Sequence, residues 1–194
     1  DDVAGSYSGV RPLKHPGAQS PTAATRDYTL KGDQTGGAPV LNVFGGKITT
    51  YRRLAESALA KIAPFFPNLP GDWTRGVALP GGDFPVDGVP ALVARLRADH
   101  PFLTEGWARR LVRAYGTEAA TILAGAQQAA DLGVDFGATL TEAEVVWLMD
   151  HEYARPATDV VWRRTKLGLR LDADQVQVLD QWIQARWAQG AAAE

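Results

Sequence analysis

The sequence has no cysteine, one methionine (Met149) and three histidines among its 194 residues. The absence of cysteine excludes disulfide bonds and thiolate metal sites, and it favours a reducing, cytoplasmic compartment. No apolar run approaches the roughly 18 residues of a membrane-spanning helix, and no segment has the pattern of a signal peptide. Any membrane association is therefore expected to be peripheral. Hydrophobic residues still make up 45% of the chain, which is enough for a globular core.

The chain begins at Asp1, and its only methionine is internal, so we expect a piece of a longer protein. Charge is distributed unevenly along it. Residues 1–75 hold nine Lys and Arg against six Asp and Glu, and the remainder holds eleven against sixteen. A mildly basic first part suits a small anionic ligand better than nucleic acid, which requires a clustered basic face. Nucleic-acid binding is not expected.

The first part of the chain has the pattern of short strands followed by one helix. We predict strands at residues 7–13, 26–30 and 40–44, with a turn over residues 31–39. From Thr49 onward apolar residues recur at helical spacing until Pro64 ends the run. The predicted unit is strand, glycine turn and helix.

The second part has the pattern of consecutive helices. Six prolines between residues 64 and 90 indicate a crossing between domains, so we predict domains over residues 1–75 and 76–194. Helix boundaries come from capping residues and turn residues. The signals used are Thr104 with Gly116, Thr117, Thr141 with Glu144, the segment 159–166, and Asp172 with Gln175. The predicted fold class is mainly α, with a C-terminal helical bundle.

The glycine turn is the first candidate site. Gly45 and Gly46 leave a strand, Lys47 follows, and a helix begins near Thr49 and Thr50. Glycines let the backbone approach a ligand, and a helix start offers unpaired N–H groups to an anion. A P-loop is excluded because its first glycine would fall at residue 41, which is leucine. A strand-to-helix turn without any ligand is the alternative.

Two arginines on the predicted strands are the second candidates. Arg11 and Arg26 could converge on one anionic substrate, because guanidinium groups bind phosphate or carboxylate oxygens in bidentate geometry. An ordinary ion pair, for example between Arg26 and Asp27, is the alternative. Histidine gives no metal site, since His151 and its acidic neighbours are consecutive helical residues that do not share a face.

Taken in order, these segments resemble the aerobic, FAD-dependent glycerol-3-phosphate dehydrogenases. The resemblance covers residues 3–188 and rests on Tyr-Ser-Gly-Val-Arg-Pro-Leu (7–13), Thr-Arg-Asp-Tyr-Thr-Leu (25–30), Phe-Gly-Gly-Lys-Ile-Thr-Thr-Tyr-Arg (44–52), Leu-Pro-Gly-Gly (79–82), Asp-Leu-Gly (131–133), Asp-Phe-Gly (135–137) and Trp-Arg-Arg-Thr-Lys-Leu-Gly (162–168). It implies that residues 1–75 are the last strands and final helix of an α/β FAD- and substrate-binding domain. It also implies an all-helical domain over residues 76–194.

The resemblance implies oxidation of sn-glycerol 3-phosphate to dihydroxyacetone phosphate by hydride transfer to FAD, with electrons passing to a membrane quinone. By it, Arg11 lies near the reacting hydroxyl, and Arg26 and Lys47 hold the substrate phosphate. The cofactor-binding residues are those of the turn, Gly45, Gly46, Lys47, Thr49 and Thr50, facing the pyrimidine edge of the flavin. The parent enzyme is expected at the cytoplasmic face of the inner membrane, peripherally bound, and a homodimer is possible.

One family feature is missing. The sequence has no Gly-x-Gly-x-x-Gly fingerprint, which binds the pyrophosphate of a dinucleotide. We therefore expect the chain alone to be inactive and free of FAD. Two alternatives stay open. One is an oxidase that passes electrons to oxygen, and the other is a non-catalytic helical module that docks partners or a membrane surface.

Overall fold

The computed structural model describes residues 6, 9 and 27–191. The predicted strand over residues 7–13 and the candidate residues Arg11 and Arg26 lie outside the described part. The backbone separates into two compact units, Asp1–Val77 and Ala78–Glu194. Within the described residues the fold is mainly helical with two small two-stranded sheets, and the predicted fold class is confirmed.

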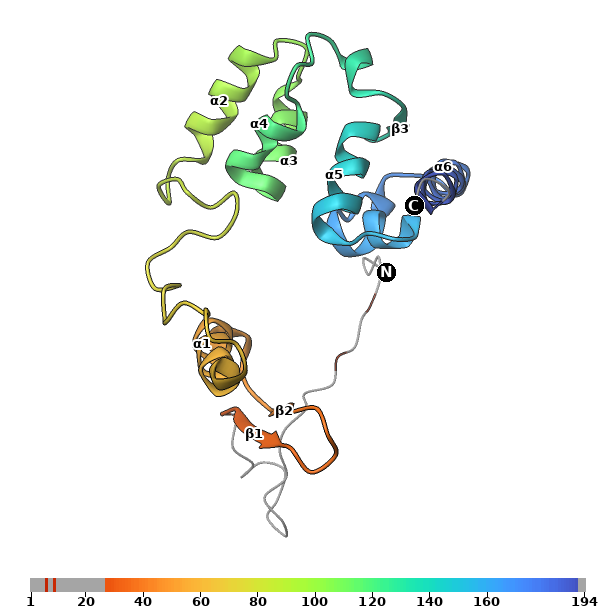
Figure 1. The fold of residues 1–194 in the computed structure, drawn as a ribbon. Coiled ribbons are helices and arrows are strands. Elements are labelled where there is room, and N and C mark those ends of the chain that lie inside the picture. The colour runs from red at the N-terminus through yellow and green to blue at the C-terminus, as the bar shows by residue number, and fades with distance from the viewer. Residues whose placement is uncertain (1–5, 7–8, 10–26, 192–194) are drawn as a thin grey trace. The chain divides into compact units, whose positions relative to one another are not determined.

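The first unit contains an antiparallel hairpin of β1 (Thr29–Asp33) and β2 (Val40–Phe44) (Figure 1). Thr29 pairs with Phe44 at one end, and Asp33 pairs with Val40 at the other. The prediction for β2 is confirmed. β1 starts later than predicted and extends into the predicted turn, because pairing with β2 draws Lys31 to Asp33 into the ladder.

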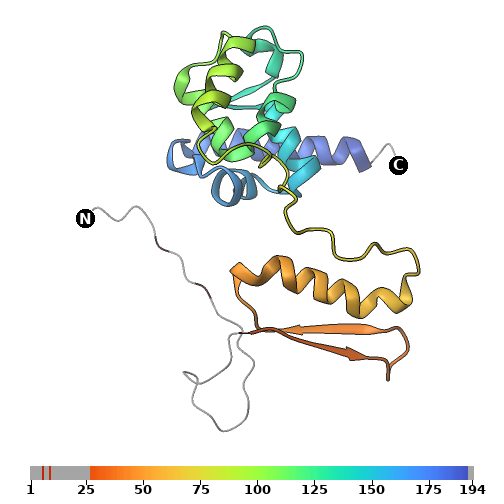
Figure 2. The ribbon, with the colours of Figure 1, turned by 90° about the vertical axis from the view of Figure 1, so that its left-hand side faces the viewer.

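The hairpin leads through two glycines into the predicted helix. A 3₁₀ turn over Ile48–Thr50 runs directly into α1 (Tyr51–Ile62), and a second 3₁₀ turn, Ala63–Phe65, contains the proline that ends it. Figure 2 shows α1 lying along the hairpin. No residue of α1 is buried in this unit, and the apolar stripe is half-buried at Leu54, Ala58 and Ile62.

The second unit carries the core. Its elements are α2 (Val89–Asp99), α3 (Glu105–Tyr115), α4 (Ala119–Ile122), β3 (Asp135–Gly137), β4 (Leu140–Thr141), α5 (Glu142–Glu152), a π-helical segment (Asp159–Arg164) and α6 (Ala173–Ala191). Within the described residues, every buried hydrophobic side chain lies between Val93 and Ile183. None of the described helices is long and apolar enough to cross a membrane.

Several predicted helix boundaries are confirmed by their hydrogen bonds. The Thr104 hydroxyl accepts the Trp107 N–H at the start of α3, and Gly116 follows the end of that helix with a positive φ of 57°. Before α6, Asp172 and Gln175 exchange backbone-to-side-chain hydrogen bonds of 3.0 and 2.8 Å. These caps depend on residues three positions apart, so the sequence alone reveals them.

Three predictions for this unit are wrong. Thr141 does precede α5, but it makes no capping bond, and Glu144 is buried instead of capping the helix. Thr117 lies inside a 3₁₀ turn and donates its hydroxyl to Asp83, and α4 is a single short turn. The unit is also not all-helical, because β3 and β4 form a tight hairpin with a register shift.

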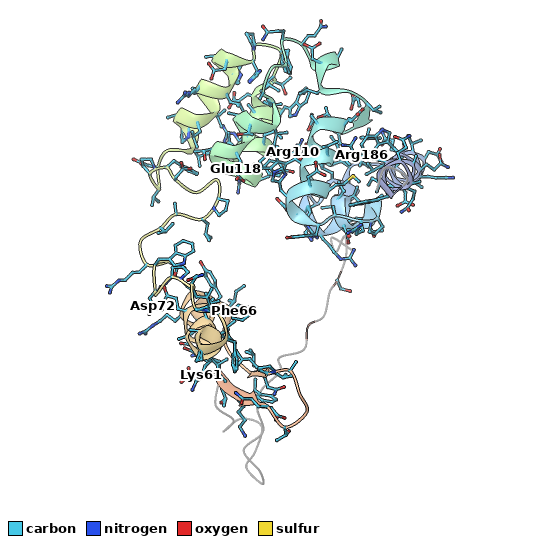
Figure 3. All side chains as sticks on the ribbon, viewed as in Figure 1. Lys61, Phe66, Asp72, Arg110, Glu118 and Arg186 are labelled. Atoms are coloured by element: carbon cyan, nitrogen blue, oxygen red, sulfur yellow. The ribbon has the colours of Figure 1, made fainter. Side chains whose placement is uncertain are left out.

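Glu144 joins α3, the hairpin and α5. Glu144 is 1% exposed. Its carboxylate accepts hydrogen bonds of 2.7 Å from both terminal nitrogens of Arg110 and from the Tyr115 hydroxyl (Figure 3 labels Arg110). Arg110 also donates to the side chain and the carbonyl of Thr139, which has a positive φ. Burial, followed by the negative charge of Glu144, raises the pKa of Tyr115 far above its ordinary value, so Tyr115 stays a hydrogen-bond donor.

The location of the core predicts that residues 78–191 fold without the rest of the chain. Starting at residue 78 keeps the hydrogen bonds of Thr117 with Gly81 and Asp83, which a start at residue 90 would remove. We expect a helical circular dichroism spectrum and a sigmoidal thermal transition for this fragment. A featureless melt of residues 78–191 would contradict the assignment of the core.

The buried ion pair predicts a large effect of Glu144→Gln. The substitution keeps the shape but leaves the Arg110 charge unpaired, which costs about 3–5 kcal/mol for a buried pair. Glu105→Gln makes the same chemical change in an exposed pair with Arg109 and should cost less than about 1 kcal/mol. Urea unfolding followed by circular dichroism measures the free energy of unfolding of both variants. An equal loss in the two variants would contradict the greater contribution assigned to the buried pair.

Candidate functional site

The turn between β2 and α1 contains the predicted cofactor-binding residues. Gly45 and Gly46 adopt positive φ angles of 71° and 105°, which residues with a Cβ rarely adopt. A Cβ on Gly46 would also lie 3.3 Å from the Leu54 side chain and 3.5 Å from Tyr28 Cβ. The double glycine therefore allows the chain to leave β2 sharply and close to α1.

Thr50 stabilises the start of the helix. Its hydroxyl accepts the Lys47 N–H at 3.3 Å and donates to the Lys47 carbonyl at 2.9 Å. The first N–H groups of the helix, those of Ile48 and Thr49, have no acceptor within a helix and lie at its positive end. The side chains of Lys47, Ile48 and Thr49 are exposed. The turn thus presents N–H donors and one ammonium group together.

A polar hollow of about 720 Å³ borders this turn at Thr50. Its other lining residues are Asp27, Tyr28, Arg52, Arg53, Glu56, Ser57, Asp72 and Arg75. Glu56 is the most connected of them, since Arg52 donates to it at 2.9 Å and Thr74 donates both its N–H and its hydroxyl. The Thr74 hydroxyl and then the Arg52 charge hold the pKa of Glu56 below its ordinary value.

Sequence reasoning missed Glu56 and Arg52. Their spacing of four residues on a helix indicates an ion pair, and that signal was available. Thr74 carries no such signal, because it lies 18 residues beyond Glu56 in a stretch rich in proline and glycine.

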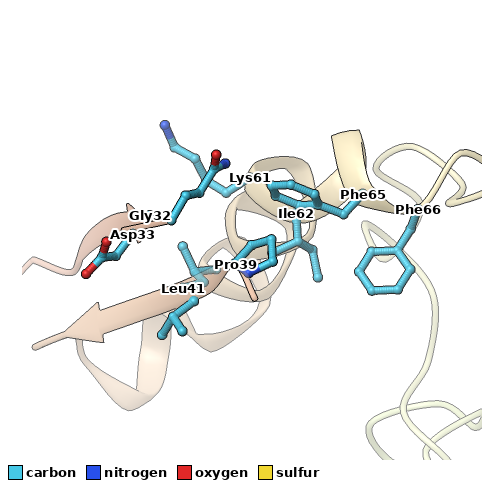
Figure 4. A pocket seen from close by; sticks show the side chains of 10 residues that line it. Gly32, Asp33, Pro39, Leu41, Lys61, Ile62, Phe65 and Phe66 are labelled. Carbon is cyan, nitrogen blue, oxygen red and sulfur yellow. The ribbon is translucent and has the colours of Figure 1, made fainter. Parts of the chain in front are cut away.

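A second, mostly apolar hollow of about 200 Å³ lies at the other end of α1 (Figure 4). It lies between the hairpin loop, near Pro39 and Leu41, and the helix end, near Ile62 and Phe65. At about 1.5 Å per residue, the twelve residues of α1 put roughly 18 Å between this hollow and the glycine turn. The apolar hollow is therefore not part of the site at the glycine turn.

In the helical unit, the His151 ring stacks on Trp147 with centroids 3.8 Å apart. The pair lines an open hollow of about 470 Å³ together with Asp150 and Arg186. Across residues 27–191, no three His, Cys, Asp or Glu side chains are grouped so that they could hold a metal ion.

Comparison with known proteins defines the class of the chain. Residues 73–186 match the family of the C-terminal domain of alpha-glycerophosphate oxidase. The chain is 49% identical over 184 residues to the aerobic glycerol-3-phosphate dehydrogenase of Escherichia coli. It is 45% identical to the glycerol-3-phosphate dehydrogenase of Pseudomonas aeruginosa, and 42% identical to the D-erythritol 1-phosphate dehydrogenase of Brucella abortus. These matches cover 94–95% of the chain.

The chain therefore belongs to the glycerol-3-phosphate dehydrogenase and oxidase family. It corresponds to the C-terminal part of these proteins. This confirms the resemblance given by the sequence motifs. The chain spans 36% of the length of these three relatives. The roles of Arg11, Arg26, Lys47 and the turn residues stay predictions.

The turn geometry predicts a specific effect of Gly46→Ala. A side chain at this positive φ costs roughly 1–3 kcal/mol, and here it also meets Leu54. We expect the hydrogen bond from the Thr50 N–H to the Lys47 carbonyl to open more often, so that this amide exchanges about tenfold faster in deuterium-exchange measurements. Gly32→Ala is the control, because that position has open space and no positive φ. Unchanged exchange in Gly46→Ala would contradict the strain argument.

Proposed function

We propose that this chain is the C-terminal part of an FAD-dependent dehydrogenase that oxidises sn-glycerol 3-phosphate to dihydroxyacetone phosphate. The observation that carries the proposal is the glycine turn, whose N–H groups without helical acceptors and exposed Lys47 suit an anionic or electron-rich group. The names of the relatives at 45% and 49% identity support the substrate. The erythritol 1-phosphate relative supports the wider class of polyol phosphates.

The turn fits a flavin by its shape and its donors. Gly45 and Gly46 have no side chain that would hold a planar ring away from the backbone. N–H groups at the positive end of the helix favour negative charge at the pyrimidine edge of the reduced ring. FAD, when bound, supplies the hydride acceptor. The residues of this chain bind and orient that ring and stabilise the negative charge of its reduced form.

We assign two tasks at the substrate to three basic residues. Arg26 and Lys47 bind the phosphate, whose charge does not change during the reaction. Arg11 lies at the substrate hydroxyl and orients the carbon that loses hydride. An anion held at a fixed place by Arg26 and Lys47 gives the orientation that hydride transfer requires.

The electron acceptor divides the family into two chemistries. We propose that the whole enzyme passes electrons to a quinone, forms a homodimer and binds peripherally at the cytoplasmic face of the inner membrane. The word aerobic in the name of the Escherichia coli relative supports a respiratory acceptor. Oxygen is the second candidate, because the matching family is described by an oxidase. The chain alone is proposed to lack both FAD and activity, since it contains no dinucleotide fingerprint.

The two arginine roles predict different kinetic effects in the full-length enzyme. Arg26→Ala should chiefly raise KM, because phosphate binding is equal in the ground and transition states, and Arg11→Ala should chiefly lower kcat. Loss of a charged partner costs about 2–5 kcal/mol, on the order of thirtyfold to several thousandfold. Steady-state kinetics with glycerol 3-phosphate and with glycerol measure this. An equal penalty on both substrates for Arg26→Ala would disprove the phosphate assignment.

A further inference from the structure

Helix α1, which carries the glycine turn at its start, is held by polar bonds in this unit. Its apolar residues Leu54, Ala58 and Ile62 are only half-buried, so apolar packing against the described residues fixes its position and rotation weakly. Two sets of bonds tie it to other segments. The Tyr28 hydroxyl lies 3.0 Å from Ser57 Oγ, and Glu56 receives the bonds from Thr74.

Glu56 concentrates three donors on one carboxylate oxygen. Arg52 Nη1 lies 2.9 Å away, the Thr74 N–H 3.3 Å away and the Thr74 hydroxyl 2.5 Å away. Arg52 Nη1 also reaches the Thr74 hydroxyl oxygen at 3.1 Å, so the three side chains close a ring of bonds. The Glu56 side chain is only 13% exposed. Bonds to a charged and half-buried acceptor are stronger than those of a solvated surface pair.

The ring lies between the glycine turn and the start of the family-matched region. Arg52 follows Thr50 by two residues, and both line the polar hollow together with Glu56. Thr74 is the second residue of the region that matches the C-terminal domain family, residues 73–186. The bonds of Glu56 therefore connect the first residues of that region to the helix that carries the turn.

We propose that Glu56, with Arg52 and Thr74, is a positioning residue that holds the Lys47–Thr50 turn in its working orientation. This inference rests on the proposed function of the turn. It assigns the positioning of the turn to residues that lie outside the turn. Without the ring, the start of α1 is no longer held against the segment at Thr74, so the Lys47–Thr50 turn loosens and its internal hydrogen bond opens more often. A displacement of about 1 Å at a reacting site can reduce the rate about a hundredfold.

Two measurements test the proposal, and the first needs no flavin. In the chain of residues 1–194, Glu56→Gln and Thr74→Val should each speed deuterium exchange at the Thr50 amide about tenfold. Thr74→Ser keeps the hydroxyl and should restore slow exchange. Glu105→Gln, the same change of carboxylate to amide in an exposed pair, should leave this amide unchanged. Unchanged exchange in Glu56→Gln and Thr74→Val would overturn the proposal.

The second measurement uses the full-length enzyme at saturating substrate and full flavin content. Glu56→Gln and Thr74→Val should lower kcat about ten- to a hundredfold at temperatures well below unfolding, and Thr74→Ser should restore it. A purely structural role would lower the melting temperature and leave kcat unchanged, which would overturn the proposal. If the unsubstituted enzyme did not oxidise glycerol 3-phosphate, the proposed function would fail, while the exchange results would still decide the role of Glu56.

Discussion

The carboxylate of Glu144 holds the helical unit together at the place where its parts meet. It is almost fully buried, and it receives Arg110 and Tyr115 from α3 while it belongs to α5. Through Arg110 it also fixes Thr139 in the hairpin loop, where the backbone has a positive φ. A charge in this position is costly unless every donor is present, so the pair requires one arrangement of α3, the hairpin and α5.

The first unit depends on a second carboxylate in a different way. The described residues of this unit include no buried side chain, so Glu56 and its donors fix α1 where a core would otherwise do so. The glycine turn at the start of α1 has N–H groups without helical acceptors, which the proposed chemistry requires. Apolar residues of this unit, among them Ile48 and Trp73, are exposed.

Sequence reasoning succeeded where the signal is local. β2, α1 and the caps at Thr104 and before α6 each depend on residues within four positions of one another, and the structure confirms them. It failed where a partner far away in the sequence determines the role of a residue. Glu144 has the spacing of a capping residue, but Arg110, 34 residues earlier in the chain, draws it into the core.

The same limit applies to the candidate site. The glycine turn was predicted because two glycines, a lysine and a helix start are adjacent in the sequence. The bond between Glu56 and Thr74 could not be predicted, since nothing in the segment around Thr74 indicates which side chain it meets. The hairpin of β3 and β4 was also missed, because its strands are very short and its loop depends on positive φ angles at Ala138 and Thr139.

We propose that the turn after β2 faces the flavin. A structure of the full-length enzyme with FAD bound tests this most directly. We expect the N–H groups of Ile48 and Thr49 to lie within hydrogen-bond distance, about 2.7–3.2 Å, of the pyrimidine edge of the flavin ring. A flavin ring bound elsewhere, with the Gly45–Thr50 turn open to solvent, would contradict it.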